Sequence, residues 1–532
     1  MIDNTANGII VHIQYFLVTI YIIRTDTMSH RSIKIIGAGI AGLSAGCYAQ
    51  MNGYQSTIYE MHTIPGGLCT SWRRGDYTFD GCLDWLTGSS PDGMFYPIWN
   101  EVGVLEKRSF INHDSYCDYL SEDGKTVRLY FHPDKLKQEL LRHAPEDKEG
   151  IDELCGLIRT FIGFKPYVQK PQELFNALDY MKMMPDMMVH LKQYRAFLKY
   201  GKISMRDFGA KMRSPLLKSL PENVWGMDFP VSMFAATMAW CAAGTAGYPE
   251  GGSLKVAQAM EKRYIALGGH IEYKSRVEEI LTENGKAAGV RLADGTEHRA
   301  DVVISAADGY TTLNRMLGGR FTSQAVQEWY ETNPTFPPYV QVSLGVARDM
   351  GGGPKLTHRR LRTPITAAGV PVPYLIIQNY ACDKTLAPAG KTPLAVRFFT
   401  DYDYWMQLYT DKKRYKAEKD KLAQDVISEL SKLYPGIERD IDVIDVATPA
   451  TYVRYTGTWK GATMSWLPTT ANFNKSIGKT LPGLAGFYMC GQWLVPGGGV
   501  PNALKTGRDV VQLICKDDKK RFVTMKAQNS KI

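Results

Sequence analysis

The sequence predicts an α/β fold, in which a Rossmann-like dinucleotide-binding domain carries an inserted α+β domain. Two observations predict it. A strand, a glycine loop, a helix and a second strand follow one another near the start of the chain, and a second glycine-rich strand-to-helix junction lies near residue 500. The chain has 532 residues, 44% of them hydrophobic and 22% charged. This length suits two to four domains, and the composition excludes a disordered, collagen-like or polytopic membrane protein.

The first unit begins with a short apolar strand at 33–36, which runs into the sequence GAGIAG at 37–42. A helical stretch at 43–52 follows, and then a second strand at 56–59 that ends at Glu60. Strand, GxGxxG, helix, strand and acid within about 30 residues form the dinucleotide-binding fingerprint. The sequence therefore predicts a bound dinucleotide at this end of the chain.

Each residue of the fingerprint has a physical role. Gly37 allows the tight turn, Gly39 lets the backbone approach a pyrophosphate, and Gly42 lets the helix pack close to the sheet. The helix N-terminus supplies free N–H groups and a positive dipole end to the phosphates. Glu60 is expected to accept hydrogen bonds from both ribose hydroxyls, and its charge disfavours a 2′-phosphate and therefore NADP.

Two further glycine segments bear on which dinucleotide binds. Gly66 and Gly67 follow Glu60 closely, which suits a flavin because its second phosphate and ribityl chain continue past the first helix. A plain glycine turn between elements is the alternative. Near the other end, an apolar strand at 486–491 and the glycines at 497–499 lead into a predicted helix at 504–514. This junction is a second candidate cradle for an anion or a carbonyl group.

These segments together resemble the FAD-dependent phytoene desaturase-like oxidoreductases, which include phytoene desaturases, carotenoid isomerases and retinol saturases. The resemblance rests on 37–54, 59–81, 248–260, 300–308, 447–462 and 489–509. It implies a two-dinucleotide-binding-type fold with non-covalent FAD. The implied FAD-binding residues are Gly37, Gly39, Ile40, Ala41, Gly42, Glu60, Gly66, Gly67, Val277, Gly491, Gly498, Val500 and Pro501.

The resemblance also implies a discontinuous FAD-binding domain, made of 28–110, 248–312 and 475–515. The pieces 111–247 and 313–474 would then form the inserted substrate or cap domain, and 516–532 a polar tail. We expect strands at 339–347, 374–378 and 394–400 in the substrate domain, and a helix at 414–433.

The segment 159–218 is unusual in composition. It holds 12 basic and four acidic residues and seven of the 22 methionines. Bases interleaved with Met, Phe and Tyr suit a helix pair lying on an anionic membrane, and flexible methionines suit a pliable apolar channel. A solvated basic face over an ordinary Met-rich core is the alternative. No nucleic-acid recognition motif accompanies the charge, so we expect no nucleic-acid partner.

Localisation is read from the N-terminus and the cysteines. Residues 1–27 carry an apolar run that is short for a spanning helix, has no basic residue before it and is not followed by a cleavage site. We expect an extension or a mis-assigned start, with a membrane anchor as the alternative. Nine scattered cysteines with no CxxC pair predict neither a zinc site nor a disulfide framework. They fit a reducing cytoplasm, so we expect a cytoplasmic protein that associates peripherally with membranes.

The sequence offers a few candidates for catalytic and channel-lining residues. Asp80 and Asp84 follow the second glycine motif and are candidates to approach the flavin, although Asp80 equally suits a turn cap. Trp493 is a candidate to pack by the flavin ring or to be a core residue. Tyr455 and Trp459 are expected to line the substrate channel. No second GxGxxG occurs, so electrons are expected to pass to or from an external partner such as a quinone, oxygen or a carrier.

The predicted function is therefore an FAD-dependent oxidoreductase. It would act on C–C or C=C bonds of a long apolar substrate, such as a carotenoid, a retinoid or another polyene lipid, by desaturation, saturation or isomerisation. Two alternatives remain open. One is a flavin amine-oxidase-type enzyme, and the other is a non-enzymatic isoprenoid-binding escort protein of the same fold.

Overall fold

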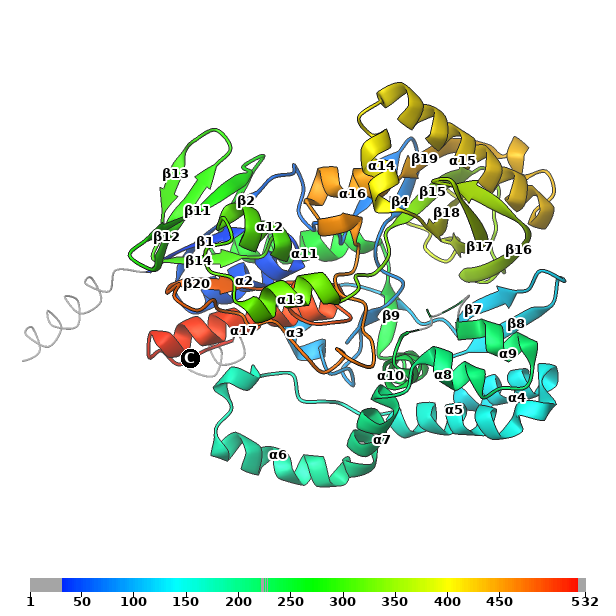
Figure 1. Cartoon of the computed structure of the whole chain (residues 1–532), viewed down its shortest axis with the longest axis horizontal. Helices are drawn as coiled ribbons and strands as arrows, with labels where there is room; N and C mark the ends of the chain where they lie inside the picture. The colour runs from blue at the N-terminus through cyan, green and yellow to red at the C-terminus, as the bar shows by residue number, and fades with distance from the viewer. Residues whose placement is uncertain (1–30, 222–223, 225, 227, 525–532) are drawn as a thin grey trace, which may run out of the picture.

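The computed structural model describes residues 31–221, 224, 226 and 228–524. The predicted N-terminal extension, 1–27, lies outside the described residues. Figure 1 shows three parts, with a parallel sheet and its helices on the left, a large mixed sheet on the right and a layer of helices below.

The first of these parts is built on a parallel sheet. Its five strands are all parallel and run in the order β10-β2-β1-β14-β20. The central strands are apolar because helices and loops cover both faces, so that Ile33 and Ile35 of β1 are fully buried. The strands are β1 (Ser32–Ile36), β2 (Gln55–Glu60), β10 (His270–Tyr273), β14 (Val302–Ser305) and β20 (Phe487–Met489).

Three helices pack beside this sheet: α2 (Ile40–Met51), α11 (Ser253–Ala266) and α17 (Gly499–Asp517). Glycine makes the closest approach possible, because a Cβ on Gly507 of α17 would lie 2.3 Å from the carbonyl oxygen of Ala41. The helix predicted from residue 504 begins at Gly499 instead. Pro501 falls in its first turn, where a missing N–H costs no helical hydrogen bond.

Two small antiparallel units accompany the larger sheets, the first beside the parallel sheet and the second beside the large mixed sheet. One is a three-stranded sheet of β11 (Val277–Glu283), β12 (Lys286–Leu292) and β13 (Glu297–Arg299). The other is a hairpin of β3 (Ser71–Arg74) and β4 (Tyr77–Asp80), which connects the first βαβ unit with the rest of the chain. Further along, β9 (Ala246–Pro249) pairs with the short strands β5 (Leu86–Thr87) and β6 (Phe110–Ile111).

The large sheet has seven strands in the order β19-β15-β18-β17-β16-β7-β8. The predicted strands at 339–347, 374–378 and 394–400 all occur in it, the second within a longer hairpin arm, and the helix predicted at 414–433 is α15. Its elements are β7 (Ser115–Leu120), β8 (Thr126–Tyr130), β15 (Tyr339–Val346), β16 (Leu356–Ala367), β17 (Val370–Asn379), β18 (Thr392–Phe399) and β19 (Ile441–Ala447), with α14 (Tyr402–Leu408), α15 (Lys412–Leu433) and α16 (Pro449–Thr456) beside them.

The helical layer is formed mainly by the first part of the inserted region. Its buried side chains form a core of their own with those of β7 and β8. The helices are α4 (Pro133–His143), α5 (Lys148–Phe161), α6 (Ala177–Val189), α7 (Leu191–Gly201), α8 (Met205–Ala210), α9 (Pro215–Leu220) and α10 (Val231–Ala242); three short helices elsewhere are α3 (Tyr96–Glu101), α12 (Gly309–Thr311) and α13 (Gln324–Thr332).

Helix α6 differs from the other helices of this layer. None of its residues is buried, and it lies along the lower edge of the molecule in Figure 1. None of the seven methionines of 159–218 lines the large cavity described below, contrary to the expectation of a methionine-lined channel. Four of them, on α6, point to solvent instead. Among the described residues, no helix combines the length and apolar character needed to cross a bilayer.

Candidate active site

The site lies where the parallel strands end. Gly37 follows β1 directly, and Glu60 is the last residue of β2. Asp308 and Gly491 lie within three residues of the carboxyl ends of β14 and β20. All four residues line one cavity of about 1210 Å³. Ligands of open α/β sheets bind at this edge, so the position agrees with the fingerprint.

The first two glycine motifs meet at one end of the cavity. The N–H of Gly66 donates to the carbonyl oxygen of Ala38 over 2.9 Å, and Gly39 and Gly66 form a parallel bridge. Helix α2 begins beside them with Gly39 at its N-cap and with no side-chain cap and no acidic residue in its first turn. The N–H groups of this turn are therefore available to an anion.

Glu60 closes the same end of the cavity. One carboxylate oxygen accepts from the N–H of Ala38 over 2.7 Å, and the other accepts from the N–H of His62 over 2.8 Å. The side chain is buried, and loss of solvent raises its pKa although these hydrogen bonds act in the opposite direction. Each oxygen keeps a lone pair for a ribose hydroxyl.

Most of the predicted cofactor residues come together here. Gly42 and Gly498 do not line the cavity but allow close packing next to it: a Cβ at Gly42 would lie 1.9 Å from the carbonyl oxygen of Gly37, and one at Gly498 would lie 2.5 Å from the hydroxyl of Ser465. The predicted residues that line the cavity are Gly37, Gly39, Ile40, Ala41, Glu60, Gly66, Gly67, Val277, Gly491, Val500 and Pro501.

The geometry of this end fits FAD. An uncapped helix N-terminus faces the position of a pyrophosphate, and a second glycine pair lies against the first. Gly66 and Gly67 have φ of +113° and +59°, values at which a residue with a side chain would be strained. Glycine at these positions also leaves the backbone accessible to a ligand. The cavity is also larger than the 300–1,000 Å³ of a pocket for one drug-sized ligand. A second ligand can therefore share it with the cofactor.

An aromatic cluster borders the middle of the cavity. Trp459 stacks on Tyr310 with 5.0 Å between ring centroids and meets Trp493 edge-on at 5.9 Å. Trp493 also packs against the fully buried Trp466, whose indole N–H donates to the carbonyl oxygen of Trp493. Trp459, Trp493 and Tyr455 all line the cavity. The sequence left open whether Trp493 faces the ligand or belongs to the core. In the structure it does both, because it lines the cavity and also packs in the core.

Asp80 does not line the cavity. Its carboxylate is fully buried at the N-terminus of α11, where it accepts from the N–H and the hydroxyl of Ser253 and from the N–H of Cys82. Burial raises its pKa, against the hydrogen bonds from Ser253. The structure therefore gives Asp80 the capping position rather than a place beside the ligand.

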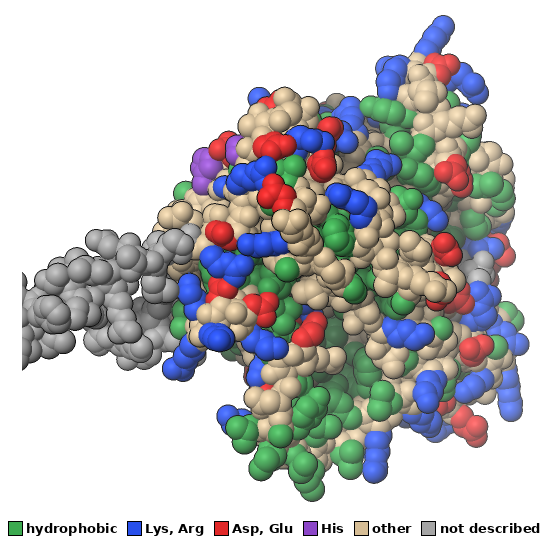
Figure 2. Space-filling view, turned by 60° about the vertical axis from the view of Figure 1, so that its left-hand side comes forward, with side chains coloured by type: hydrophobic (Ala, Val, Ile, Leu, Met, Phe, Trp, Pro, Cys, Tyr) green, Lys and Arg blue, Asp and Glu red, His purple; other side chains and the backbone are tan. Residues whose placement is uncertain are grey.

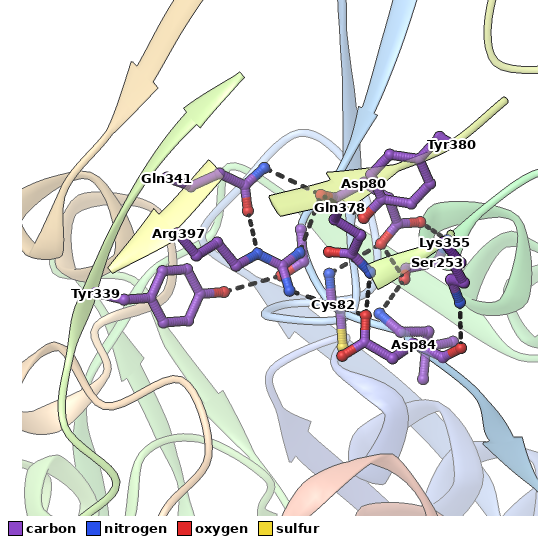
Figure 3. Close-up of polar contacts among 12 residues, drawn as sticks. Asp80, Cys82, Asp84, Ser253, Tyr339, Gln341, Lys355, Gln378, Tyr380 and Arg397 are labelled. Atoms are coloured by element: carbon purple, nitrogen blue, oxygen red, sulfur yellow. Dashed lines mark hydrogen bonds and ion pairs between the residues drawn. The ribbon is translucent and has the colours of Figure 1, made fainter. Parts of the chain in front are cut away.

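Asp84 has a different environment. It lines the cavity, and its carboxylate accepts from the side-chain amide of Gln378 and lies 4.0 Å from the guanidinium of Arg397. Figure 3 shows these side chains converging from β17 and β18 on the loop that follows β4. Arg397 also donates to Gln341 over 2.8 Å. A charged cluster is thus built into a largely apolar wall.

Two further residues of the site are not among the candidates that the sequence predicts, although Asp308 ends the segment 300–308 on which the family resemblance rests. Asp308, at the end of β14, caps α12 through the N–H of Thr311 and accepts from the N–H of Trp459, each over 2.9 Å. Burial raises its pKa to about 6. Arg397 interrupts the apolar run of β18, and a lone arginine in such a strand is the signal that could have marked it.

Comparisons with known proteins agree with this geometry. Residues 40–515 match the family described as flavin containing amine oxidoreductase. The chain is 26% identical over 501 residues to the chloroplastic prolycopene isomerase of Arabidopsis thaliana, covering 88% of this chain and 79% of that protein. It is 25% identical over 507 residues to the neurosporene-forming phytoene desaturase of Rhodobacter capsulatus, covering 90% and 93%.

Solved structures show the same fold at lower identity. An oxidoreductase from Methanosarcina mazei superposes with a TM-score of 0.55 at 15% identity, covering 90% of this chain and all of that one. Cyclohexylamine oxidase from Brevibacterium oxydans superposes with a TM-score of 0.57 at 12% identity, covering 92% of this chain and all of that one. The predicted fold class is therefore confirmed.

Proposed function

Because the chain belongs to the flavin-containing amine oxidoreductase family, we propose that this FAD-dependent enzyme acts on C–C or C=C bonds of a long apolar polyene. The observation that carries the proposal is one continuous cavity that is lined both by the glycine loops and by an apolar wall. The relatives named above act on polyenes by name, as isomerase and desaturase. The predicted family resemblance, enzyme class and cofactor are confirmed by the family match.

The residues of the chain bind the cofactor, orient the polyene and shield the reacting carbons from water. The loops at Gly39 and Gly66 hold the pyrophosphate, and Glu60 holds the adenosine ribose. Trp459 and Trp493 present flat apolar surfaces against which an extended polyene packs. Bound FAD supplies two-electron chemistry by accepting or giving a hydride. The buried aromatic cluster keeps water away from the reacting carbons.

The wall opposite the glycine loops supports an apolar substrate. It combines aromatic and aliphatic side chains from the large sheet with others from the helical layer. These elements are far apart in the sequence and come together in the fold. Its members include Tyr116, Phe229, Phe234, Met238, Phe336, Tyr339, Leu356, Tyr374, Ile376 and Phe399.

An amine substrate is the second candidate, and less supports it. The amine oxidases among the structural neighbours are under 25% identical and share the fold alone. The confirmed enzyme class leaves the escort-protein alternative without support.

We also propose that 159–218 docks on an anionic membrane surface at the cytoplasmic side, from which the substrate reaches the cavity. Exposed apolar side chains gather on α6 and α7, and Figure 2 shows a green patch at the lower edge, where α6 lies in Figure 1. The exposed residues include Leu178, Tyr180, Met181, Met184, Met187, Met188, Val189, Leu191 and Leu198. Exposed Lys192, Arg195, Lys199 and Lys202 lie beside them.

A spectral screen tests the function. The purified protein should carry a flavin spectrum, and anaerobic enzyme should change oxidation state, or the polyene should change isomer, when phytoene or prolycopene is added in lipid vesicles. Putrescine and cyclohexylamine serve as the amine arm, and free FAD without protein is the control. Reaction with the amines and not with the polyenes would replace the proposed substrate class. An external acceptor such as a quinone or oxygen would complete turnover.

A further inference from the structure

The charged cluster around Asp84 is costly for a cavity that holds a hydrocarbon. Moving ionised groups out of water is unfavourable unless partners compensate. Arg397 is only 11% exposed in its side chain, whereas 33% of the Asp84 side chain is exposed, toward the cavity that it lines. Both side chains line the cavity, and Asp84 is the more exposed of the two toward a ligand.

The surroundings hold Asp84 in place from several elements. The amide of Gln378, on β17, donates to its carboxylate, and the ammonium of Lys355, just before β16, donates to its backbone carbonyl. The Lys355 ammonium also lies 4.3 Å from the centre of the Tyr248 ring. Figure 3 shows Lys355 and Arg397 approaching Asp84 from different sides. Such fixed geometry is what a proton-transferring group requires.

Behind Asp84 lies a second, small cavity. It has a volume of about 20 Å³, which is room for one water molecule. Asp84 and Tyr116 line both cavities, whereas His113 and Lys355 line only the small one. The Nε2 atom of His113 is buried and finds no hydrogen-bond partner among the described residues. A water there would find a polar partner on each side.

His113 presents a neutral imidazole to the small cavity. Burial and the Lys355 ammonium lower its pKa to about 4, while the Asp84 charge acts in the opposite direction. The imidazole is therefore neutral at pH 7 and has an accepting nitrogen. The residue is half-buried between the exposed Asn112 and Asp114, so solvent lies next to it.

We propose that Asp84 exchanges a proton with the substrate and that His113 passes this proton between Asp84 and solvent through the small cavity. This inference rests on the proposed function and adds the proton path that it needs. In desaturation, a hydride leaves one carbon for oxidised FAD and a proton leaves the neighbouring carbon for the Asp84 carboxylate. The electron pair of that second C–H bond becomes the new π bond.

Saturation runs the same steps in reverse, with reduced FAD giving the hydride and Asp84 giving the proton. In either direction two electrons pass to or from FAD, and a quinone or oxygen acceptor, or a matching donor, restores it. Asp84 is the catalytic residue, and His113 acts through it. The other ionisable groups that interact with Asp84 are Tyr116, Tyr339, Lys355, Tyr380 and Arg397. Cys241 lines the small cavity with it.

A substrate-free measurement tests the link between the two residues. In holoenzyme labelled with ¹³C at histidine Cε1, the titration of His113 is identified by its loss in His113→Phe. Asp84→Asn should move that titration to lower pH, because it removes the negative charge that favours the imidazolium. Asp76→Asn, whose side chain is 63% exposed in the preceding hairpin, should leave it unchanged. A His113 titration that ignores Asp84→Asn would overturn the proton path whether or not any polyene reacts.

Single-turnover kinetics with phytoene and prolycopene in vesicles test the catalytic role. Asp84→Asn should slow the flavin absorbance change at least about 100-fold, with the flavin spectrum and polyene Kd retained, and Asp84→Glu should restore part of the rate. His113→Phe should preserve the first turnover and slow later ones. A rate for Asp84→Asn within twofold of wild type contradicts the role of Asp84. If wild type reacts with neither polyene, the proposed function fails, and the titration still decides the link.

Discussion

Gly42 and Gly37 approach so closely that a Cβ at position 42 would lie 1.9 Å from the carbonyl oxygen of Gly37. This contact fixes the first turn of α2 against the end of β1, which is where the pyrophosphate is expected. Backbone cannot yield as a flexible side chain can, so a methyl group here must displace the loop itself.

Gly42→Ala should therefore lose FAD. We expect protein that is colourless or that binds added FAD at least about tenfold more weakly, as measured by flavin fluorescence quenching, because the displaced loop no longer presents its N–H groups. Gly156→Ala is the matched control, since a Cβ there meets nothing within 4 Å. Wild-type FAD affinity in Gly42→Ala would mean that this contact does not shape the cofactor site.

Asp308 predicts a specific pH dependence of stability. Its pKa rises from 3.8 to about 6 on folding, chiefly because it is buried. The folded protein thus binds the proton more tightly than the unfolded chain, so this contribution is complete below pH 3.8 and is lost as the pH rises through 6. The loss amounts to roughly 3 kcal/mol.

Urea unfolding of wild type and Asp308→Asn between pH 3.5 and 6.5 measures this contribution. The free energy of unfolding of wild type minus that of the variant should fall as the pH rises. A difference that stays constant over this range would contradict the assigned environment of Asp308. A difference that rises with pH would mean that folding lowers the pKa of Asp308 instead of raising it.

The aromatic cluster predicts a large packing effect. Trp466 is fully buried, packs on Trp493 and donates its indole N–H to the carbonyl oxygen of that residue. Trp466→Ala should cost about 3–5 kcal/mol in the free energy of unfolding. Ile265→Ala, at a side chain with 55% of its surface exposed, should stay within about 0.5 kcal/mol of wild type. Equal effects of the two substitutions in urea unfolding would contradict this cluster.

The surface of α6 and α7 predicts membrane binding that depends on charge. Replacing Lys192, Arg195, Lys199 and Lys202 by Glu should abolish co-sedimentation with phosphatidylglycerol vesicles, because each basic group near an anionic surface contributes about 1 kcal/mol. The same replacement of Lys412, Lys413, Lys416 and Lys421, on exposed positions of α15 far from α6, is the control. Unchanged sedimentation of the first variant would remove the membrane proposal.

The glycine end of the site could be predicted from the sequence because its information is local. One βαβ unit contains Gly37, Gly39, Gly42 and Glu60. Their spacing alone predicts which of them follow the first strand and which ends the second. The predicted domain boundaries and the ligand roles of these residues stay predictions, although the residues lie together as expected.

The opposite wall could not be predicted in this way. Arg397 and Asp80 are 317 positions apart, yet the guanidinium donates to the Asp80 carbonyl and lies beside Asp84. Such a pairing depends on the packing of the large sheet against the β3–β4 hairpin, and no local pattern encodes it. Four methionines of α6 show the same limit, because composition marked them while only the fold shows that they face outward.

The central claim is that the cavity holds FAD beside a polyene, and mass analysis after one anaerobic turnover tests it most directly. The oxidised and the photoreduced enzyme are each mixed with phytoene or prolycopene, and the recovered polyene is analysed by chromatography and mass spectrometry. The account predicts a product that differs by one H₂, or an isomer of unchanged mass and altered retention. A polyene recovered unchanged, together with oxidation of an added amine, would contradict it.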